Sequence, residues 1–314
     1  MSETERKVPE LSLLSYVNGS SSDQVKFVDD IMMGLKEYGF IVLTDHTVDQ
    51  SKVDDAYEMV KEFFALPVEQ KLKYKGQNGG QRGYTPFGQE HAKDNPHPDL
   101  KEFWHVGRTL SKDSAYLGVY PENVWPSEVS NFKAAFTELY TAMDKTSEVL
   151  LEAIGRGLDV PQNFFKDMIT DGNSILRTIH YPPTKGQDTK NSIRAAAHGD
   201  INLITMLVGA TASGLQLLDR DDTWLDVNSK PGQLVVDTGD MMERLTNGVL
   251  PATIHRVINP DNDGSERYSM PYFVHPHSNA SLSCLPSCLG DGKKYEDITA
   301  GEFLNQRLRE IGLM

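Results

Sequence analysis

The stretch RAAAHGDINLITML, residues 194–207, combines a His-x-Asp pair with an apolar run that predicts a core strand. Side chains alternate between the two faces of a strand, so we expect His198 and Asp200 to point the same way, about 7 Å apart along the chain. The run from Ile201 to Leu207 reads as the strand itself. The sequence therefore predicts an imidazole and a carboxylate side by side next to a buried strand.

A second histidine, His255, lies in the strand-like segment 252–258. If the two segments are neighbours, two imidazoles and one carboxylate meet on one side of a metal ion. Such a facial triad leaves three coordination positions open and is typical of non-haem Fe(II) oxygenases. Spacing alone leaves an alternative open, in which the same three residues are polar groups of the core, satisfied by hydrogen bonds.

Two other histidine motifs could also be interpreted as metal ligands. The chain has nine histidines, so such motifs can arise by chance. His97-Pro98-Asp99 lies in a stretch rich in Pro, Asp and Asn, and a proline cannot donate to an internal strand ladder. We therefore expect a loop there. His275-Pro276-His277 ends a predicted strand at a proline and has no carboxylate nearby in the sequence. We expect surface or strand-terminal histidines at that position rather than a metal site.

Two further pairs of residues share a strand face. Arg267 and Ser269 lie two positions apart on a predicted strand, and a planar fork of donors beside a hydroxyl suits a carboxylate. Arg177 and Tyr181 are also in phase on the segment 174–181, so both should point into the same interior. A structural ion pair is the alternative for Arg177, and a surface salt bridge is the alternative for Arg267.

Composition sets limits on the kind of protein. At 314 residues the chain can hold one large domain or two small ones, and its formal charge of −14 argues against nucleic-acid binding and against anionic membranes. No apolar run approaches the roughly 18 residues of a membrane helix, and the polar N-terminus lacks the apolar core of a signal peptide. The only cysteines are Cys284 and Cys288, which we expect to be reduced thiols in a cytoplasmic protein.

The first 160 residues read as mixed and mostly helical, and the chain changes character after about residue 170. Before this point it predicts mostly helices, one capped by Ser21 or Ser22 and stopped by Gly39, and a long one from Ser127 to Leu158. The Gly-rich loop at 75–84 is a candidate lid or rim. A phosphate loop is the alternative, but no GKS or GKT follows the glycines. Later come short strand-like runs at 174–181, 194–208, 215–218, 224–227, 233–237, 253–258 and 267–274, then a helix at 301–311. We expect a mixed α/β (α+β) fold whose β-core is a sandwich or a jelly roll.

Several motifs together resemble the isopenicillin N synthase-like family of Fe(II)/2-oxoglutarate-dependent dioxygenases. The main ones are His198-Gly199-Asp200, His255-Arg256-Val257 and Arg267-Tyr268-Ser269. Flanking pieces follow the order of the family: Glu37-Tyr38-Gly39-Phe40 with Asp45-His46, His180-Tyr181-Pro182-Pro183, Gly214-Leu215-Gln216, Trp224, Pro231-Gly232, Gly239-Asp240 and Thr246-Asn247-Gly248. The resemblance runs from about residue 8 to residue 311, nearly the whole chain.

The resemblance implies a distorted double-stranded β-helix at 161–314, buttressed by a helical region at 1–160 within one compact catalytic unit. It implies that His198, Asp200 and His255 bind Fe(II), and that Arg267, Ser269 and Tyr181 bind 2-oxoglutarate. The expected activity is hydroxylation, desaturation or ring formation on a small molecule, with O2 consumed and 2-oxoglutarate converted to succinate. Two alternatives stay open: an Fe(II)/O2 oxidase of the isopenicillin N synthase type that does not use 2-oxoglutarate, and a non-catalytic β-helix protein.

Substrate contacts are expected from Arg177, Phe273, Arg82 and Tyr84. Phe273 shares the strand phase of Arg267 and Ser269, and Arg82 and Tyr84 belong to the Gly-rich loop. Phe87, Phe103 and Trp104 are further candidates for the roof of the pocket. The family's asparagine-tyrosine pair is replaced here by Ile179-His180, so we expect a substrate different from that of the plant-type relatives. The polar stretch 184–192 is a candidate rim loop. We expect no nucleic-acid or membrane partner.

Overall fold

The computed structural model describes residues 6–76, 81–90, 97–183, 192–209, 211–259 and 265–310, and two sheets organise this part of the chain. The large sheet has the order β1-β2-β10-β7-β12-β5-β4-β3. Its strands are β1 (Glu10–Ser12), β2 (Phe40–Thr44), β3 (Gly83–Thr85), β4 (Glu102–Gly107), β5 (Ile175–Tyr181), β7 (Ile204–Val208), β10 (Leu234–Thr238) and β12 (Arg267–Val274). The small sheet has the order β6-β11-β8-β9, with β6 (Ala195–His198), β8 (Leu215–Leu218), β9 (Trp224–Asp226) and β11 (His255–Val257).

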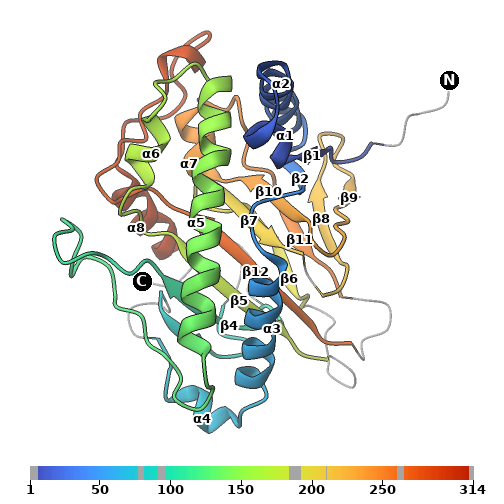
Figure 1. Cartoon of the computed structure of the whole chain (residues 1–314), viewed down its shortest axis with the longest axis vertical. Helices are drawn as coiled ribbons and strands as arrows, with labels where there is room; N and C mark the ends of the chain where they lie inside the picture. Colours follow the sequence, from blue (N-terminus) through green and yellow to red (C-terminus); the bar gives the residue numbers. More distant parts are fainter. Residues whose placement is uncertain are drawn as a thin grey trace.

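Helices pack on the large sheet. In Figure 1 the long helix α5 (Phe132–Gly157) runs the height of the molecule, with α2 (Ser21–Tyr38) and α3 (Gln50–Phe64) beside it. Their apolar faces join one core with the inner residues of β7 and β12. The remaining helices are short: α1 (Leu13–Asn18), α4 (Val68–Leu72), α6 (Phe164–Ile169), α7 (Asp240–Leu245), the 3-10 turn η1 (Pro286–Cys288) and α8 (Ala300–Glu310).

The mixed α/β architecture with a β-helix core is confirmed. The N-terminal half adds the strands β1 to β4, which lie on both edges of the large sheet. β2 pairs with β10, and β4 pairs with β5, so both halves of the sequence build the same layer. Within the described part of the chain, no helix is long and apolar enough to cross a membrane.

The boundaries of the first long helix follow from its caps. Ser20, rather than Ser21 or Ser22, is the N-cap, because its hydroxyl accepts a hydrogen bond from the Asp23 amide while the Asp23 carboxylate accepts from the Ser20 amide. Gly39 ends the helix at φ 67°, a conformation that favours glycine. A Cβ at Gly39 would also collide with the Thr253 hydroxyl. The glycine therefore lets α2 pass close to the segment that leads into β11.

The predicted strand 194–208 is not continuous. β6 ends at His198 in the small sheet and β7 begins at Ile204 in the large sheet, so residues 199–203 cross between the sheets. The Asn202 amide holds this crossing by donating to the Ile204 carbonyl at 2.7 Å. The Asp240 amide of α7 donates to the Asp200 carbonyl at 2.8 Å. His198 and Asp200 are thus neighbours at a crossing between layers, not two positions along one strand.

Candidate active site

The crossing segment brings three predicted ligands together at one end of the small sheet. His255, the first residue of β11, pairs in register with His198, the last residue of β6. The Nε2 atoms of both rings lie 3.9 Å from Oδ1 of Asp200. One ligand atom from each residue falls within 4.8 Å of the others, and no second group of this kind occurs among the described residues.

Hydrogen bonds orient each of these groups. Nδ1 of His198 lies 2.7 Å from the Ala196 carbonyl, and Nδ1 of His255 lies 3.2 Å from the Thr253 carbonyl. A ring that donates from Nδ1 carries its lone pair on Nε2, which is the form that binds a metal. The Thr205 hydroxyl donates to Oδ2 of Asp200 and leaves Oδ1 facing the two Nε2 atoms. Two imidazole nitrogens and one carboxylate oxygen on one side fit Fe(II).

The electrostatics support a neutral imidazole at His198. Burial, together with the neighbouring His255, lowers the pKa of His198 to about 4, so the ring is uncharged at neutral pH. Asp237 on β10 also lines the site, and burial with the nearby Asp200 carboxylate raises the pKa of its carboxyl well above the usual value. Asp237 could not be found from the sequence, since an acidic residue inside an apolar strand has no periodic signature.

A cavity extends from the three ligands between the two sheets. Both layers contribute to its wall: Lys101, Arg177, Ile179, Tyr181, Ala195, His198, Asp200, Thr205, Leu207, Leu215, Asp237, His255, Val257, Arg267, Ser269, Pro271 and Phe273. β5 and β12 pair so that Tyr181 faces Arg267 and Ile179 faces Ser269. The predicted 2-oxoglutarate residues therefore share the cavity of the metal triad.

Arg267 marks one end of this cavity. Its guanidinium is 1% exposed, donates to the Ala212 carbonyl at 3.1 Å and to the Ser269 hydroxyl at 3.3 Å, and lies 4.9 Å from the centre of the Tyr181 ring. No carboxylate forms an ion pair with it among the residues that the structure describes. A buried cation without a counter-ion is costly unless an anion binds there.

Arg177 marks the other end. Its Nε atom donates to His105 at 2.6 Å and its Nη1 atom donates to Glu90 at 3.1 Å. The guanidinium carbon lies 4.1 Å from the centre of the Phe103 ring and 5.3 Å from that of Phe273. The structure thus combines both interpretations of Arg177, an ion pair and a place in the cavity wall. The aromatic rings hold its plane in a fixed orientation.

An ion cluster supports this second end of the cavity. Lys101 is buried and contacts Glu90 at 3.0 Å and Asp99 at 2.8 Å. Burial acts to raise the pKa of Glu90, but Arg177 and Lys101 together hold it below its usual range. Lys101 and Glu90 were not predicted from the sequence, because single charged residues in a loop carry no pattern. Asp99, part of a motif expected to be a loop, also accepts a hydrogen bond from the Ala196 amide and so braces β6.

Other sequence candidates lie elsewhere. Arg82 and Tyr84 do not line the cavity: Arg82 donates to Asn173 at 2.9 Å, and the Tyr84 hydroxyl donates to Glu102. Trp104 is fully buried in the core and Phe87 is 41% exposed. His275 is buried beyond the end of β12, and His277 contacts the Tyr116 hydroxyl at 2.8 Å. Residues 77–80 of the Gly-rich loop and residues 184–191 lie outside the described residues.

The replacement Ile179-His180 is split between two environments. Ile179 lines the cavity, whereas His180 points to the opposite face of the sheet, contacts Glu102 at 2.8 Å and stacks on the Tyr268 ring at 4.8 Å between centroids. The family asparagine position is therefore apolar at the cavity wall in this protein.

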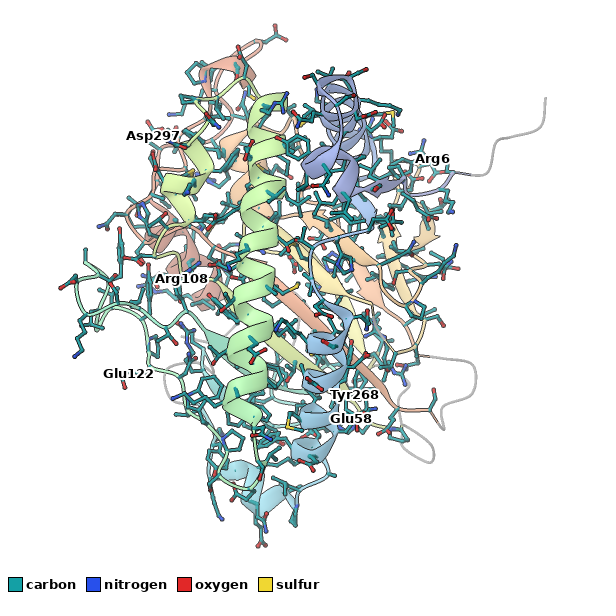
Figure 2. The ribbon with its side chains drawn as sticks, viewed as in Figure 1. Arg6, Glu58, Arg108, Glu122, Tyr268 and Asp297 are labelled. Atoms are coloured by element: carbon teal, nitrogen blue, oxygen red, sulfur yellow. The ribbon has the colours of Figure 1, made fainter. Side chains whose placement is uncertain are left out.

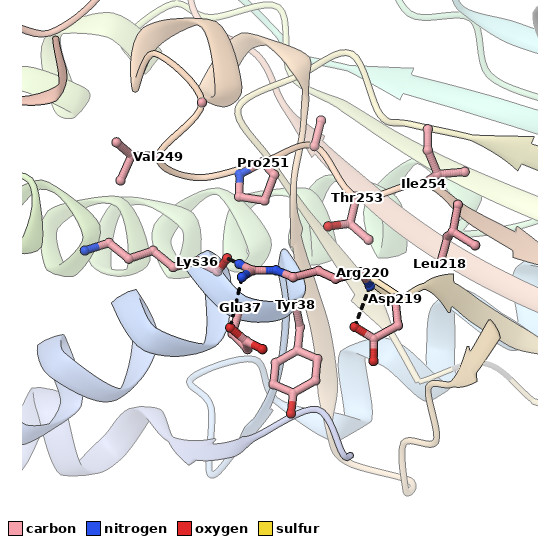
Figure 3. Close-up of a pocket in the computed structure, with 12 residues that line it drawn as sticks. Lys36, Glu37, Tyr38, Leu218, Asp219, Arg220, Val249, Pro251, Thr253 and Ile254 are labelled. Carbon is pink, nitrogen blue, oxygen red and sulfur yellow. Dashed lines mark hydrogen bonds and ion pairs between the residues drawn. The ribbon is translucent and has the colours of Figure 1, made fainter. Parts of the chain in front are cut away.

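A second, larger hollow lies behind the segment that leads into His255. Figure 3 shows its lining from α2, the β8–β9 hairpin and residues 248–254, around a volume of about 380 Å³. Arg220 contacts Glu37 at 3.3 Å, and its backbone amide donates to Asp219 at 2.7 Å. Of its lining residues, Arg220 and Glu37 form an ion pair, and none of the three metal-site residues lines it.

Comparisons with known proteins agree with this geometry. Residues 8–128 match the family described as non-haem dioxygenase in morphine synthesis, N-terminal, and residues 172–276 match the 2OG-Fe(II) oxygenase superfamily. The 2-oxoglutarate-Fe(II) type oxidoreductase hxnY of Emericella nidulans is 31% identical over 309 residues, which cover 94% of this chain and 88% of that protein.

Solved structures give the same result. A 2OG-Fe(II) oxygenase family protein from Caulobacter crescentus is similar with a TM-score of 0.87 and 46% identity, over 96% of this chain and 98% of that one. A full-length protein from Neurospora crassa, solved with alpha-KG and with alpha-KG plus thymine, is similar with a TM-score of 0.87 and 26% identity, over 98% of both chains.

The cofactor of this enzyme is Fe(II) and its co-substrate is 2-oxoglutarate, and it oxidises small molecules. These findings confirm the predicted activity over the oxidase that does not use 2-oxoglutarate and over a non-catalytic protein. With both family models matched in order and the metal triad in place, the chain belongs to the isopenicillin N synthase-like family of 2-oxoglutarate- and Fe(II)-dependent oxygenases.

Proposed function

We propose that His198, Asp200 and His255 hold the iron, while Arg267 and Ser269, beside Tyr181, bind the distal carboxylate of 2-oxoglutarate. The observation that carries this assignment is the buried Arg267 guanidinium, which shares the cavity of the triad and has no carboxylate partner among the described residues. A guanidinium and a hydroxyl on one strand face match a carboxylate in shape and charge.

Bound iron and 2-oxoglutarate supply the oxidation: O2 is consumed, 2-oxoglutarate loses CO2 to give succinate, and the substrate is hydroxylated, desaturated or cyclised. The contribution of the chain is orientation. Backbone carbonyls fix the two imidazoles, Thr205 fixes Asp200, and the β5–β12 pairing fixes Arg267 opposite Tyr181. Small shifts of the substrate decide which product forms, because reacting atoms must meet at close range.

The substrate, in this proposal, lies toward Arg177 and Phe273. Two donor edges of Arg177 are used by His105 and Glu90, and the rest of its guanidinium lines the cavity wall. Ile179 and Phe273 make the surrounding wall apolar. We therefore expect a small molecule with an apolar body and a carbonyl or carboxylate acceptor. The thymine held by the Neurospora crassa relative is a molecule of comparable chemistry.

We also propose that residues 1–160 and 161–314 act as one catalytic unit, which is supported by the sheet that both regions build. A cytoplasmic location is proposed on the basis of two cysteines that are free in the structure.

The test of the metal assignment is an anaerobic titration of the apo-protein with Fe(II) and then with 2-oxoglutarate, followed by visible absorption. We expect a weak charge-transfer band only when both are present. His198→Ala and Asp200→Ala should lose the band and succinate release while keeping the fold by circular dichroism. His277→Ala, a histidine outside the cavity, is the matched control and should keep both. Unchanged turnover in either triad variant would overturn the assignment.

A further inference from the structure

A second buried arginine lies behind the proposed 2-oxoglutarate site. Arg194 directly precedes β6, is 2% exposed, and is absent from the cavity wall. Its Nη2 atom donates to the Ser265 carbonyl at 2.5 Å, and its backbone amide donates to the Asn259 side chain at 3.0 Å. Its Nε atom is buried and has no hydrogen-bond partner within the described residues. No carboxylate pairs with it in that part of the chain.

Arg194 and Arg267 lie near the same ring. The guanidinium carbon of Arg267 is 4.9 Å from the centre of the Tyr181 ring, and that of Arg194 is 5.9 Å from it. These distances limit the separation of the two guanidinium carbons to about 11 Å. Burial, and after it the charge of Arg267, lowers the pKa of Arg194, as expected for two buried cations in proximity.

Two uncompensated cations at this position are unfavourable in the protein without its ligand. The chain as a whole carries a formal charge of −14, so acidic groups are plentiful, yet none pairs with these two arginines in the described structure. A ligand with a negative group beside Arg267 would relieve both charges, because a Coulombic interaction over about 10 Å remains appreciable in a protein interior.

We propose that Arg194 is a positioning residue of the co-substrate pocket: acting through Tyr181 and through its charge, it selects a keto acid that carries a distal carboxylate. This inference rests on the proposed 2-oxoglutarate site. Tyr181 lines the cavity and Arg194 does not, and both Arg194 and Arg267 lie within cation–π distance of the Tyr181 ring. Ser265 and Asn259 anchor Arg194 to the ends of β12 and β11, so its charge is fixed relative to Arg267.

The experiment compares two ligands that differ only at the distal end. The full chain is loaded with Zn(II), which excludes turnover, and titrated by calorimetry with 2-oxoglutarate and with 2-oxopentanoate, which has a methyl group in place of the distal carboxylate. Arg194→Gln should weaken 2-oxoglutarate binding roughly tenfold, the size expected for one charge at about 10 Å and an effective dielectric constant near 20. Binding of 2-oxopentanoate should not change. Arg194→Lys keeps the charge and should stay within about threefold of the wild type for both ligands.

Arg108→Gln is the matched control, since Arg108 (labelled in Figure 2) is a mostly buried arginine that pairs with Asp144 of α5 and does not line the cavity. This variant should lower the melting temperature and leave both affinities unchanged. If Arg194 has a purely structural role, Arg194→Gln should weaken the binding of both ligands equally or the binding of neither. Either result overturns the proposal. If Arg194→Gln does not fold, Arg194→Met removes the same charge with a side chain of similar length and is judged by the same comparison. Wild-type protein that fails to bind 2-oxoglutarate would instead refute the proposed function itself.

Discussion

At the scale of single residues, the metal site depends on residues that orient the proposed ligands by hydrogen bonds. Thr205 is the clearest case, because its hydroxyl is the donor that keeps Oδ2 of Asp200 away from the two imidazoles. Outer groups of this kind orient the ligands, and losing one typically weakens metal affinity.

Thr205→Val should therefore weaken Fe(II) binding by about 10- to 100-fold while keeping the shape of the side chain. Thr178→Val is the matched control on β5, because the buried Thr178 hydroxyl has no partner within the described residues. Removing it should leave iron binding unchanged and raise the free energy of unfolding by up to about 1 kcal/mol. Competition with a colorimetric chelator measures the affinity. Equal Fe(II) affinity in the wild type and Thr205→Val would show that Asp200 needs no support.

Arg267→Ala tests the proposed anchor of 2-oxoglutarate. Loss of a buried guanidinium that pairs with a carboxylate should cost about 2–5 kcal/mol of binding free energy. Calorimetric titration of the Zn(II)-loaded protein with 2-oxoglutarate gives this value directly. An affinity equal to that of the wild type would place the distal carboxylate elsewhere in the cavity.

Site residues that belong to a motif could be predicted from the sequence, whereas isolated site residues could not. His198, Asp200 and His255 could be read from their motifs and from the resemblance, and the structure brings them together, although His198 and Asp200 lie at a crossing between layers and not along one strand. Arg82 and Tyr84 were expected near the substrate because they lie in a Gly-rich loop, yet their side chains turn to Asn173 and Glu102. Which way a loop side chain turns depends on partners distant in sequence, and a single sequence does not display them.

At the scale of secondary structure elements, a buried polar network joins four of them. Glu102 on β4 accepts hydrogen bonds from Lys71 of α4 at 2.8 Å and from Tyr84 of β3, and it contacts His180 of β5 at 2.8 Å. Lys71 and Glu102 are each about 5% exposed. A charge left alone in such an environment is strongly destabilising.

Glu102→Ala should lower the free energy of unfolding by about 3–5 kcal/mol, because it leaves Lys71 buried without its partner. Urea unfolding at neutral pH measures the change. Glu138→Gln removes an exposed carboxylate that pairs with Lys52 and should have little effect. A small change for Glu102→Ala would mean that Lys71 finds water or another acceptor.

The same network predicts a pH dependence. Burial acts to raise the pKa of Glu102, but hydrogen bonds from His180, Lys71 and Tyr84 outweigh it and lower the pKa in the folded protein. The ionised carboxylate therefore contributes stability above its unfolded pKa, about 4.3, and this contribution is lost as the pH falls through the lower folded value. Urea midpoints between pH 7 and pH 3 should decrease less steeply for Glu102→Gln than for the wild type. Parallel curves would assign the acid sensitivity to other carboxylates.

Element boundaries were predictable where local chemistry decides them. The end of α2 at Gly39 was read correctly, because a left-handed residue must close the helix. The break between β6 and β7 was not foreseen, since RAAAHGDINLITML has the composition of one strand. That crossing is held by the Asp240 amide, about 40 residues later in the chain, and a contact over such a sequence distance leaves no local signature.

At the scale of the whole molecule, the family resemblance predicted more than periodicity did. Short strands at regular spacing indicated only a sandwich or a jelly roll. The shared motif order added the double-stranded β-helix, and both family models match in the expected order. Neither approach predicted that N-terminal strands extend the large sheet at both edges, because β1 to β4 are short and lie among helices.

The break between β6 and β7 has a further consequence for the assembled protein. Both imidazoles belong to the small sheet, whereas Asp200 is hydrogen-bonded to Thr205 of the large sheet. A metal bound to all three residues would therefore cross-link the two sheets. Removing iron should destabilise the metal-binding end of the small sheet rather than the centre of the large sheet. Hydrogen–deuterium exchange of the β6 and β11 amides should then accelerate on chelation, while that of β7 and β12 stays slow. The exchange rate of the β6 and β11 amides would thus report how much of the protein has iron bound, and its measurement requires no substrate.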